Sequence, residues 1–236
     1  MIKVELHTHT ADDPADLIPH TTTDLIDRAS ELGFGAIAVT LHDRQLDIHR
    51  FDAYARERGL VLIRGIERTI QGKHVLLLNF PARAERVEDF DDVAALKRDC
   101  PAGLVIAPHP FYPGSTCLRG LMDRYCGLFD AVEMNYFFTP EIDFNRPAVR
   151  WAKRHGRPLV ANSDLHRLHQ LGRTYSLVDA VPDPDAICAG IRAGRVEVRT
   201  TPITLVEAAT YFGDLWIAKV VKTWRQLRPE TEPAAA

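Results

Sequence analysis

Short apolar runs alternate with amphipathic stretches along most of the chain. Each run has the length of a strand and is bounded by turn-forming residues such as Gly, Pro, Asp or Asn. We predict strands at residues 2–6, 36–40, 60–66, 75–80, 104–107, 131–135, 159–162, 175–178 and 196–200.

Between most of these runs, apolar residues recur with the spacing of an α-helix. In the first such stretch, Thr21 and Asp24 have the spacing of a capping box, Leu25 and Ala29 lie on one face, and Gly33 ends the helix. Residues 71–73 are instead predicted to form a hairpin turn, where two strands follow each other directly. We predict further helices at residues 47–58, 87–98, 118–125, 147–155 and 184–193.

Repeated βα units predict parallel strands, in either a closed barrel or an open doubly wound sheet. A closed barrel gathers the carboxyl ends of its strands around one mouth, whereas an open sheet would use a Gly-rich loop, which is missing here. Polar residues recur at those ends and therefore favour an α/β barrel. They are His7, His9, His42, Glu67, His109, Glu133, Asn135, Asp164 and His166.

Composition narrows the class of protein. A chain of 236 residues with 46% hydrophobic content can form one barrel with a sizeable core. The net charge of −3 gives no overall basic field, so no specific nucleic-acid partner is expected. The cysteines form no C-x-x-C pair, and no apolar run approaches the ~20 residues of a membrane span. Because the first strand begins almost at Met1, leaving no room for a signal peptide, we expect a cytoplasmic protein.

The chain divides into three predicted parts. Residues 1–205 form the barrel, residues 206–228 form a C-terminal helical extension, and residues 229–236 form a disordered tail. In the extension, Phe212 and Trp216 lie near one helical face with basic residues close by. Packing against the barrel or a second subunit is expected, which makes the chain a candidate homo-oligomer. A basic helix that lies on a membrane surface is the alternative.

Histidines are concentrated at the predicted mouth. His7 and His9 are two residues apart on an extended segment, so their rings point to the same side and could bind one ion. Surface histidines would instead lie mostly on helices. The candidate ligands outnumber the four that one zinc ion needs, and they indicate two or three ions with a bridging carboxylate. They are His7, His9, His20, His42, Glu67, His74, His109, Asp164 and His166.

Five motifs in their order resemble the PHP (polymerase and histidinol phosphatase) domain. They are His7-x-His9, Thr40-x-His42-Asp43, Gly65-Ile66-Glu67, His109-Pro110 and Ser163-Asp164-x-His166. The resemblance implies a distorted (β/α)7 TIM-like barrel. It also implies a di- or trinuclear centre of divalent ions, such as zinc, manganese, iron or magnesium, that hydrolyses phosphoesters.

The resemblance also assigns ligands to each ion. One ion would be bound by His7, His9, Glu67 and Asp164, a second by His42 and His166, and a third by Glu67, His74 and His109.

This sequence departs from the family pattern in two places. The family often has Ser-Asp-Gly after the first motif, where this chain has Asp12-Asp13-Pro14. We prefer His20 as the residue that completes the second ion's shell, with Asp12 or Asp13 as the alternative. Leu41 stands where family members usually have an aspartate, which changes the hydrogen bonds available to the neighbouring histidine.

The expected reaction is cleavage of a phosphate ester on a small substrate, in the nucleotide, sugar or amino-alcohol phosphate class. A hydroxide bridged between ions would attack phosphorus in line, and His42, His166 or Asp43 would protonate the leaving oxygen. Arg68 and Arg173, adjacent to motif residues, are candidates to bind the phosphate.

Other interpretations remain open. An amidohydrolase-type enzyme also begins with His-x-His on the first strand of a barrel, and a PHP module can bind metal without catalysis. Aromatic residues at 111–112 and 136–138 follow strand ends, where they could stack on a nucleobase or simply pack.

Overall fold

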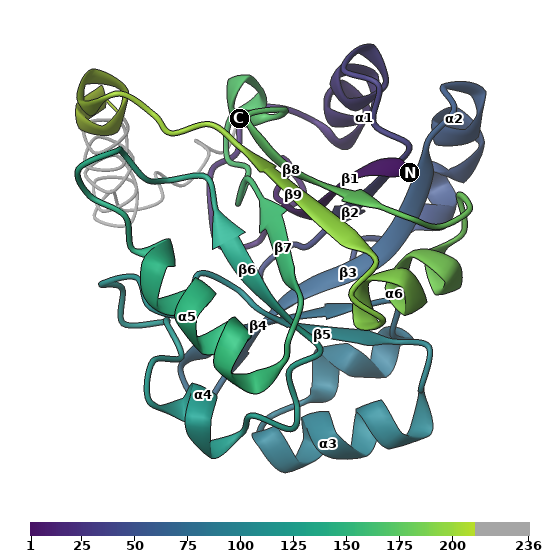
Figure 1. Cartoon of the computed structure of the whole chain (residues 1–236). Coiled ribbons are helices and arrows are strands. Elements are labelled where there is room, and N and C mark those ends of the chain that lie inside the picture. Colours follow the sequence, from purple (N-terminus) through teal and green to yellow (C-terminus); the bar gives the residue numbers. More distant parts are fainter. Residues whose placement is uncertain (211–236) are drawn as a thin grey trace, which may run out of the picture.

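The computed structural model describes residues 1–210, whose strands form one nine-stranded sheet curled into a barrel (Figure 1). Neighbouring strands follow the order β7-β6-β5-β4-β3-β2-β1-β8-β9. The strands are β1 (Ile2–Thr8), β2 (Ala36–Val39), β3 (Val61–Ile70), β4 (Lys73–Leu78), β5 (Leu104–Ala107), β6 (Ala131–Asn135), β7 (Leu159–Asn162), β8 (Thr174–Val178) and β9 (Val196–Thr200).

The helices lie outside this sheet and begin close to where the pattern predicts. Thr21 and Asp24 form the predicted capping box of the first helix. The stretch at 47–58 is divided into a 3-10 turn and a short helix, and the helix predicted from residue 87 begins at Phe90, capped by Asp89 and Asp92. The helices are α1 (Thr22–Glu31), α2 (Asp52–Glu57), α3 (Phe90–Asp99), α4 (Leu121–Arg124), α5 (Asn145–His155) and α6 (Pro184–Arg192).

Two strands run against the other seven. The predicted hairpin after the third strand implied the reversal of β4, whereas the parallel direction expected of β8 from the repeated βα pattern is wrong. β4 is antiparallel to both β3 and β5, and β8 is antiparallel to both β1 and β9. β4 is reversed because Gln71 and Gly72, both with positive φ, form the predicted hairpin turn after β3. β8 follows β7 without a crossover α-helix, which a parallel connection would require. The α/β barrel-like fold is confirmed, whereas the (β/α)7 count is not, since the sheet has nine strands.

A side chain joins β7, at one end of the sheet, to β8, the strand next to the other end. β7 and β8 are not neighbours in the hydrogen-bonded order, yet the Ser176 hydroxyl on β8 accepts from the Ala161 N–H at 2.8 Å and donates to the Ala161 carbonyl at 3.2 Å. Ser176 is fully buried. The barrel is therefore nearly closed, and β7 is held beside β8.

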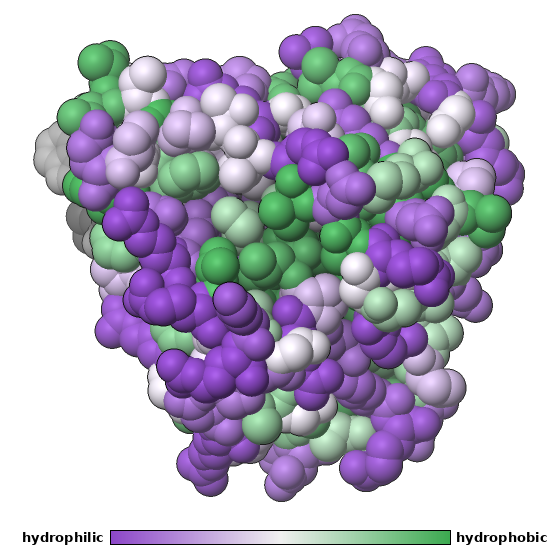
Figure 2. All heavy atoms as spheres, in the orientation of Figure 1, coloured by the Kyte–Doolittle hydropathy of each residue, from purple (hydrophilic) through white to green (hydrophobic). Residues whose placement is uncertain are grey.

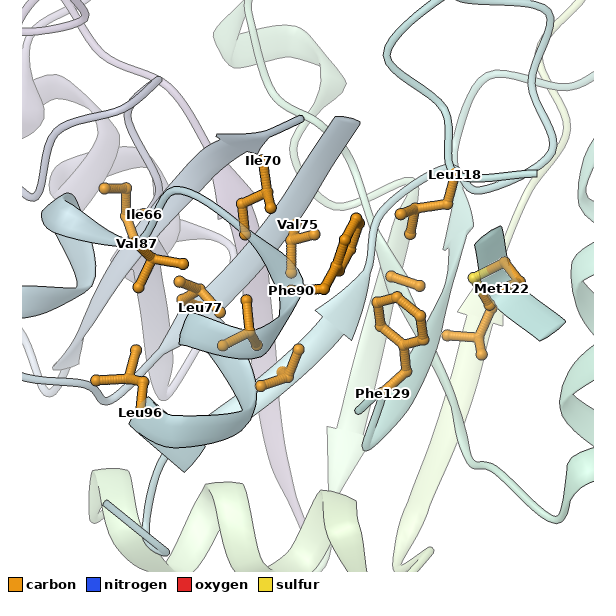
Figure 3. Close-up of a cluster of buried hydrophobic side chains, with 14 of the residues drawn as sticks. Ile66, Ile70, Val75, Leu77, Val87, Phe90, Leu96, Leu118, Met122 and Phe129 are labelled. Carbon is orange, nitrogen blue, oxygen red and sulfur yellow. The ribbon is translucent and has the colours of Figure 1, made fainter. Parts of the chain in front are cut away.

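The core lies both inside and outside the barrel. Inside, small and branched residues such as Val4, Ala38 and Ile106 are fully buried. Outside, a large cluster joins β3 to β6 with α3, α4 and α5, and Figure 3 shows Phe90 and Phe129 among its members. Another cluster joins α1 and α2 to β2 and β3. Packing on both faces fixes the strands, so their carboxyl ends are held at a common mouth.

The C-terminal part is described only at its start. Residues 205–210 are helical. The remainder of the predicted extension and the predicted tail at 229–236 lie outside the described residues. Among residues 1–210, no helix is both long and apolar enough to cross a membrane.

Replacing Ser176 by Ala tests the closure between β7 and β8. The substitution leaves the buried N–H and carbonyl of Ala161 without the hydroxyl, so we expect unfolding free energy to fall by about 1–3 kcal/mol. Urea unfolding measures the change. Exposed Ser115 is the control, and Ser115→Ala should change stability by less than about 0.5 kcal/mol. Equal stability of the two variants would contradict the closure.

Candidate metal centre

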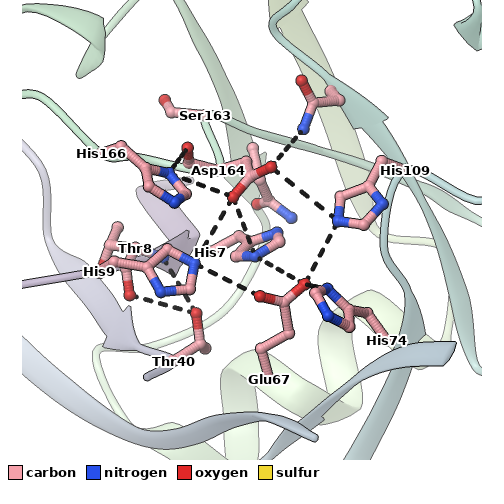
Figure 4. A network of polar contacts seen from close by, with 12 residues as sticks. His7, Thr8, His9, Thr40, Glu67, His74, His109, Ser163, Asp164 and His166 are labelled. Atoms are coloured by element: carbon pink, nitrogen blue, oxygen red, sulfur yellow. Dashed lines mark hydrogen bonds and ion pairs between the residues drawn. The ribbon is translucent and has the colours of Figure 1, made fainter. Parts of the chain in front are cut away.

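The barrel mouth gathers side chains from most of the strands (Figure 4). β1 contributes His7 and, directly after its end, His9, while His42 follows β2. His109 follows β5, and the segment after β7 supplies Asp164 and His166. Sequence segments more than 150 residues apart thus meet at a single site, as the barrel prediction required.

Two ligand candidates lie within strands instead of after them. Glu67 was predicted to follow the third strand, but β3 continues to Ile70, so Glu67 lies inside β3. His74 is the second residue of β4. In a parallel strand it would lie at the opposite end of the barrel, but because β4 is reversed its first residues reach the mouth.

The Glu67 carboxylate is the centre of this cluster. It is buried, with 1% exposure, and its oxygens face five histidine rings. The distances are 3.4 Å to His7 Nε2, 3.5 Å to His9 Nε2, 3.2 Å to His42 Nε2, 2.7 Å to His74 Nδ1 and 3.3 Å to His109 Nε2.

Asp164 provides a second carboxylate on the opposite side of these rings. Its Oδ1 lies 3.3 Å from His7 Nε2 and 3.5 Å from His9 Nε2, and it lies 3.6 Å from His166 Nδ1. His7 and His9 are therefore placed between Glu67 and Asp164, as Figure 4 shows.

Carboxylates behind the rings determine which ring nitrogen faces the centre. Glu133, fully buried on β6, accepts from His7 Nδ1 at 2.9 Å. Asp13 Oδ2 accepts from both His9 Nδ1 and His42 Nδ1 at 2.9 Å. With Nδ1 donating outward, the Nε2 lone pairs of these rings point toward Glu67 and Asp164, where a metal ion can bind them.

The charges in the cluster shift the pKa values of its members. Burial alone would raise the pKa of Glu67, but His7 and His74 outweigh it and hold the pKa well below its usual range. Burial would lower the pKa of His42, but its hydrogen bond to Asp13 and the charge of Glu67 raise it to about 9. Without metal, the buried carboxylates therefore favour the protonated forms of His7 and His42.

The donor set fits divalent metal ions. His7 Nε2 and His9 Nε2 are buried and, among the described residues, make no hydrogen bond of normal geometry. Ring nitrogens that face carboxylate oxygens at 3.3–3.5 Å without bonding are expected of ligands arranged around a common cation. Five overlapping groups could each bind an ion: His7–His109–Asp164, His7–His9–Glu67, His9–Asp13–His42, His9–Asp164–His166 and His42–Glu67–His74.

The backbone of the mouth is strained at three positions. Asp43, His109 and Asp164 have φ of 54°, 29° and 46°, in the left-handed region that non-glycine residues rarely adopt. Such strain persists only where surrounding contacts enforce it, and it is frequent at functional sites. Here it occurs in three of the turns that present the polar side chains.

The structure brings eight of the nine predicted ligands together and leaves out His20. His20 is buried, but no metal-binding group within the described residues includes it. The Ala11 N–H donates to the His20 carbonyl at 2.7 Å, which closes the loop and turns Asp13 toward His9 and His42. Asp13, one of the two alternatives to His20, therefore joins the cluster, while Asp12 bonds to Thr22.

The remaining predicted residues lie nearby in ion pairs. Asp43 Oδ1 accepts from Arg68 Nη1 at 2.6 Å and from the Thr69 N–H at 2.7 Å. Arg173 Nη2 lies 2.6 Å from Glu207 Oε1. Both predicted phosphate-binding arginines are thus paired with carboxylates here, and their role remains a prediction.

Sequence reasoning gave no role to three acidic residues of the site. Glu133 and Glu5 are fully buried, and Asp16 lies 3.4 Å from His166 Nε2. Burial raises the pKa of Glu5 to about 8, even though Ser163 donates hydrogen bonds to it. A signal existed for the two glutamates, because each interrupts an apolar strand, and Glu5 shares the strand face of His7.

Comparison with protein-family models gives a match to part of the chain. Residues 143–196, which include Asp164 and His166, match the family described as PHP-associated. No curated protein matches the chain.

Several solved structures share the fold. A two-domain protein from Bacteroides vulgatus ATCC 8482 that contains a predicted PHP-like metal-dependent phosphoesterase is 20% identical, with a TM-score of 0.63, over 84% of this chain and 64% of that one. The lesion-specific endonuclease PfuEndoQ from Pyrococcus furiosus is 16% identical, with a TM-score of 0.56, over 89% of this chain and 66% of that one. An amidohydrolase from Chromobacterium violaceum is 15% identical, with a TM-score of 0.54, over 69% of this chain and 87% of that one.

At these identities, the structural likeness shows the fold. The chain spans slightly less than two thirds of the first two proteins. Together with the PHP-associated match over residues 143–196, the fold agrees with the predicted resemblance.

We expect the metal-free protein to become less stable as pH rises from 6.5 to about 9. The folded-state pKa of His42 is about 9 against 6.5 in the unfolded chain, so the folded state binds the extra proton. That stabilisation is complete below pH 6.5 and is lost as pH rises through about 9. The melting temperature of the chelator-treated protein, followed as a function of pH, measures this loss of stability. Each kcal/mol lost should lower the melting temperature by roughly 2–4 °C.

His42→Gln is the control for this pH dependence and should reduce it, because glutamine does not titrate; other histidines with raised pKa values, such as His166, keep their share of it. A melting temperature that rises with pH in the metal-free protein would contradict the proton balance. With saturating Mn²⁺ the dependence should also weaken, since the ion binds the neutral rings in place of protons.

Proposed function

We propose that this chain is a PHP-type, metal-dependent phosphoesterase that cleaves phosphate esters of small molecules. The PHP-associated match over residues 143–196 and the shared fold support the proposal. The observation that carries the proposal is the Glu67 carboxylate, buried among five histidine rings and facing Asp164 across two of them. A donor set of this size exceeds the needs of one structural ion, and its position at the mouth gives substrate access.

The proposed ligand assignment is the one that the PHP resemblance implies. His7, His9, Glu67 and Asp164 would bind one ion, and His74 and His109 would share Glu67 with another. His42 and His166 would bind a further ion. Asp13, which bonds to Nδ1 of both His9 and His42, would hold these two rings with Nε2 toward the ions. When bound, such ions lower the pKa of a water molecule and offset the charge of the phosphoryl group.

Among the proposed proton donors, His166 has the most support. Its side chain is 17% exposed, against 0% for His7 and His9, so it can contact both substrate and solvent. In the metal-free protein, burial would lower its pKa, but Asp16 and Asp164 raise it. His42, 14% exposed, is the alternative donor.

Asp43 fits a role in substrate binding better than a role as proton donor. Its carboxylate is 42% exposed but accepts from Arg68 and from the Thr69 backbone. Arg68 also donates to the Val87 carbonyl at 2.8 Å. We propose that Asp43 holds Arg68 at the edge of the mouth, where a substrate phosphate would compete with Asp43 for the guanidinium.

Hydrolysis of simple phosphoesters tests the proposal. Glu67→Ala should lose at least about 100-fold in metal-dependent kcat/KM, because even residues behind a ligand typically contribute 10–100-fold. The double variant His7→Ala/His9→Ala should lose activity and bound metal together. Assays with p-nitrophenyl phosphate and bis-p-nitrophenyl phosphate, each with Mn²⁺ or Zn²⁺, measure both.

The matched control is His49→Ala, since His49 is 71% exposed on the surface. It should keep full activity and metal content. Full hydrolysis by the His7→Ala/His9→Ala variant would refute the assignment. Hydrolysis of amides but of no phosphoester would favour the amidohydrolase alternative, and metal binding without hydrolysis would favour a non-catalytic module.

A nucleic-acid substrate is the second candidate. Helix α5 contains Arg146, Arg150, Lys153 and Arg154 but no acidic residue, and all four are exposed. Hydrophilic side chains gather over α5 in Figure 2. Within residues 1–210, Arg150 and Arg154 form no ion pair, and the similarly folded PfuEndoQ is an endonuclease. Although the net charge of the chain is −3, helix α5 therefore carries a local basic stripe that could bind phosphates.

The double variant Arg150→Ala/Arg154→Ala tests this candidate. Binding of a fluorescent single-stranded oligonucleotide should weaken about 10-fold at low salt. The slope of log affinity against log salt concentration should decrease by the equivalent of about two phosphate contacts. Hydrolysis of p-nitrophenyl phosphate should not change. Arg50→Ala/Arg56→Ala, with the same charge change on and beside α2, is the control; equal weakening by both pairs would refute a site on α5.

A further inference from the structure

The ligand candidates come from two segments that the sheet itself does not join. His7 and His9 belong to the end of β1, while Asp164 and His166 follow β7. In the sheet order, β1 is bonded to β2 and β8, and β7 is bonded to β6. Some other contact must therefore fix the distance between the two segments.

Beyond the strand ends, a short backbone link forms between them. The Leu165 N–H donates to the His7 carbonyl at 3.0 Å, and the His9 N–H donates to the Leu165 carbonyl at 3.0 Å. These two bonds lie at the mouth itself. They fix the backbone on either side of Thr8. In the segment below it, the Leu6 N–H donates to Asn162 Oδ1 at 3.3 Å.

The side chain of Glu5 links that lower segment. On its own strand, Glu5 Oε1 accepts from the Leu6 and His7 N–H groups at 3.2 Å. Across the gap it accepts from the Ser163 N–H at 3.0 Å, and Oε2 lies 2.6 Å from the Ser163 hydroxyl. Ser163 directly precedes Asp164, and Figure 4 shows the two side by side.

This link is inaccessible to substrate and to ions. Glu5 and Ser163 are both 0% exposed, and neither is in any of the metal-binding groups formed by described residues. The Ser163 hydroxyl also lies 3.3 Å from the Thr174 carbonyl, so the link extends to β8. The contacts of Glu5 are thus directed at the backbone on both sides of the ligand pair.

We propose that Glu5 is a positioning residue that fixes the spacing between the His7–His9 and Asp164–His166 pairs, so that the ligand set is formed before an ion binds. The inference rests on metal binding at the proposed site and does not require hydrolysis. A protein with this link binds metal without first ordering the two segments, and therefore binds it more tightly.

Titration with Co²⁺ tests the proposal directly. The visible absorption of bound Co²⁺ reports both affinity and ligand geometry, independently of any substrate. Glu5→Ala removes every contact that the Glu5 carboxylate makes with the two segments and should weaken Co²⁺ binding about 10–100-fold, with an altered spectrum. Glu5→Gln retains an oxygen for the N–H groups and an amide that can donate to Ser163, so it should bind within about 3-fold of wild type.

Asp130→Ala separates positioning from general stability. Asp130 is also buried, at 4% exposure, and accepts from the Val105 N–H at 3.0 Å, but it lies before β6 at the other end of the barrel. It should lower melting temperature without changing Co²⁺ affinity. If Glu5→Ala binds Co²⁺ like wild type, or if both variants lose affinity in proportion to stability, the proposal is wrong.

A serine pair keeps the test decisive if Glu5→Ala does not fold. Ser163 and Ser176 are both fully buried and both bridge strands, but Ser176 does so away from the ligand segments. Ser163→Ala should weaken Co²⁺ binding several-fold, and Ser176→Ala should leave it unchanged. Unchanged binding in Ser163→Ala would overturn the proposal even if phosphoesterase activity is confirmed, whereas absent hydrolysis would leave it standing.

Discussion

The burial of the Glu67 carboxylate is the constraint on which the barrel mouth depends. A carboxylate with 1% exposure loses its hydration, and this costs several kcal/mol unless positive or hydrogen-bonding groups replace the water. The five histidine rings within 3.5 Å can do so as imidazolium ions or as neutral ligands of a shared cation. Protons and metal ions therefore compete for the same ring nitrogens, and the fold must hold those rings in place for either.

The reversed direction of β4 shows how the strand topology holds a histidine ring beside Glu67. The hairpin after β3 has two purposes: it lengthens β3 so that Glu67 lies within a bonded strand, and it returns the chain with His74 near the start of β4. The His74 ring then lies 2.7 Å from Glu67. A parallel strand with the same sequence would place this histidine at the opposite end of the barrel, about one strand length away.

Much of this arrangement could be predicted from the sequence. Apolar runs gave the strands, Thr21 and Asp24 gave the first helix start, and polar residues at strand ends gave most of the mouth, because each signal is local. The predicted hairpin at residues 71–73 indicated the reversal of β4, but the direction of β8 was predicted wrongly, since periodicity shows which face is buried but not which way a strand runs. The loop after His9 was also undetermined, because the Ala11–His20 hydrogen bond that turns Asp13 inward leaves no trace in residue spacing.

The ligand turns show how such a site is held. Three of the six non-glycine residues with positive φ among residues 1–210 are Asp43, His109 and Asp164. Left-handed backbone costs about 1–3 kcal/mol per residue, so contacts elsewhere must outweigh it. The Asp43 N–H donates to the Glu67 carbonyl at 3.0 Å, and Leu165, next to Asp164, donates to His7. The strained turns are thus bonded to neighbouring ligand-bearing segments, so relaxing one turn would also break a contact to the next. This coupling favours a ligand set that forms as a unit.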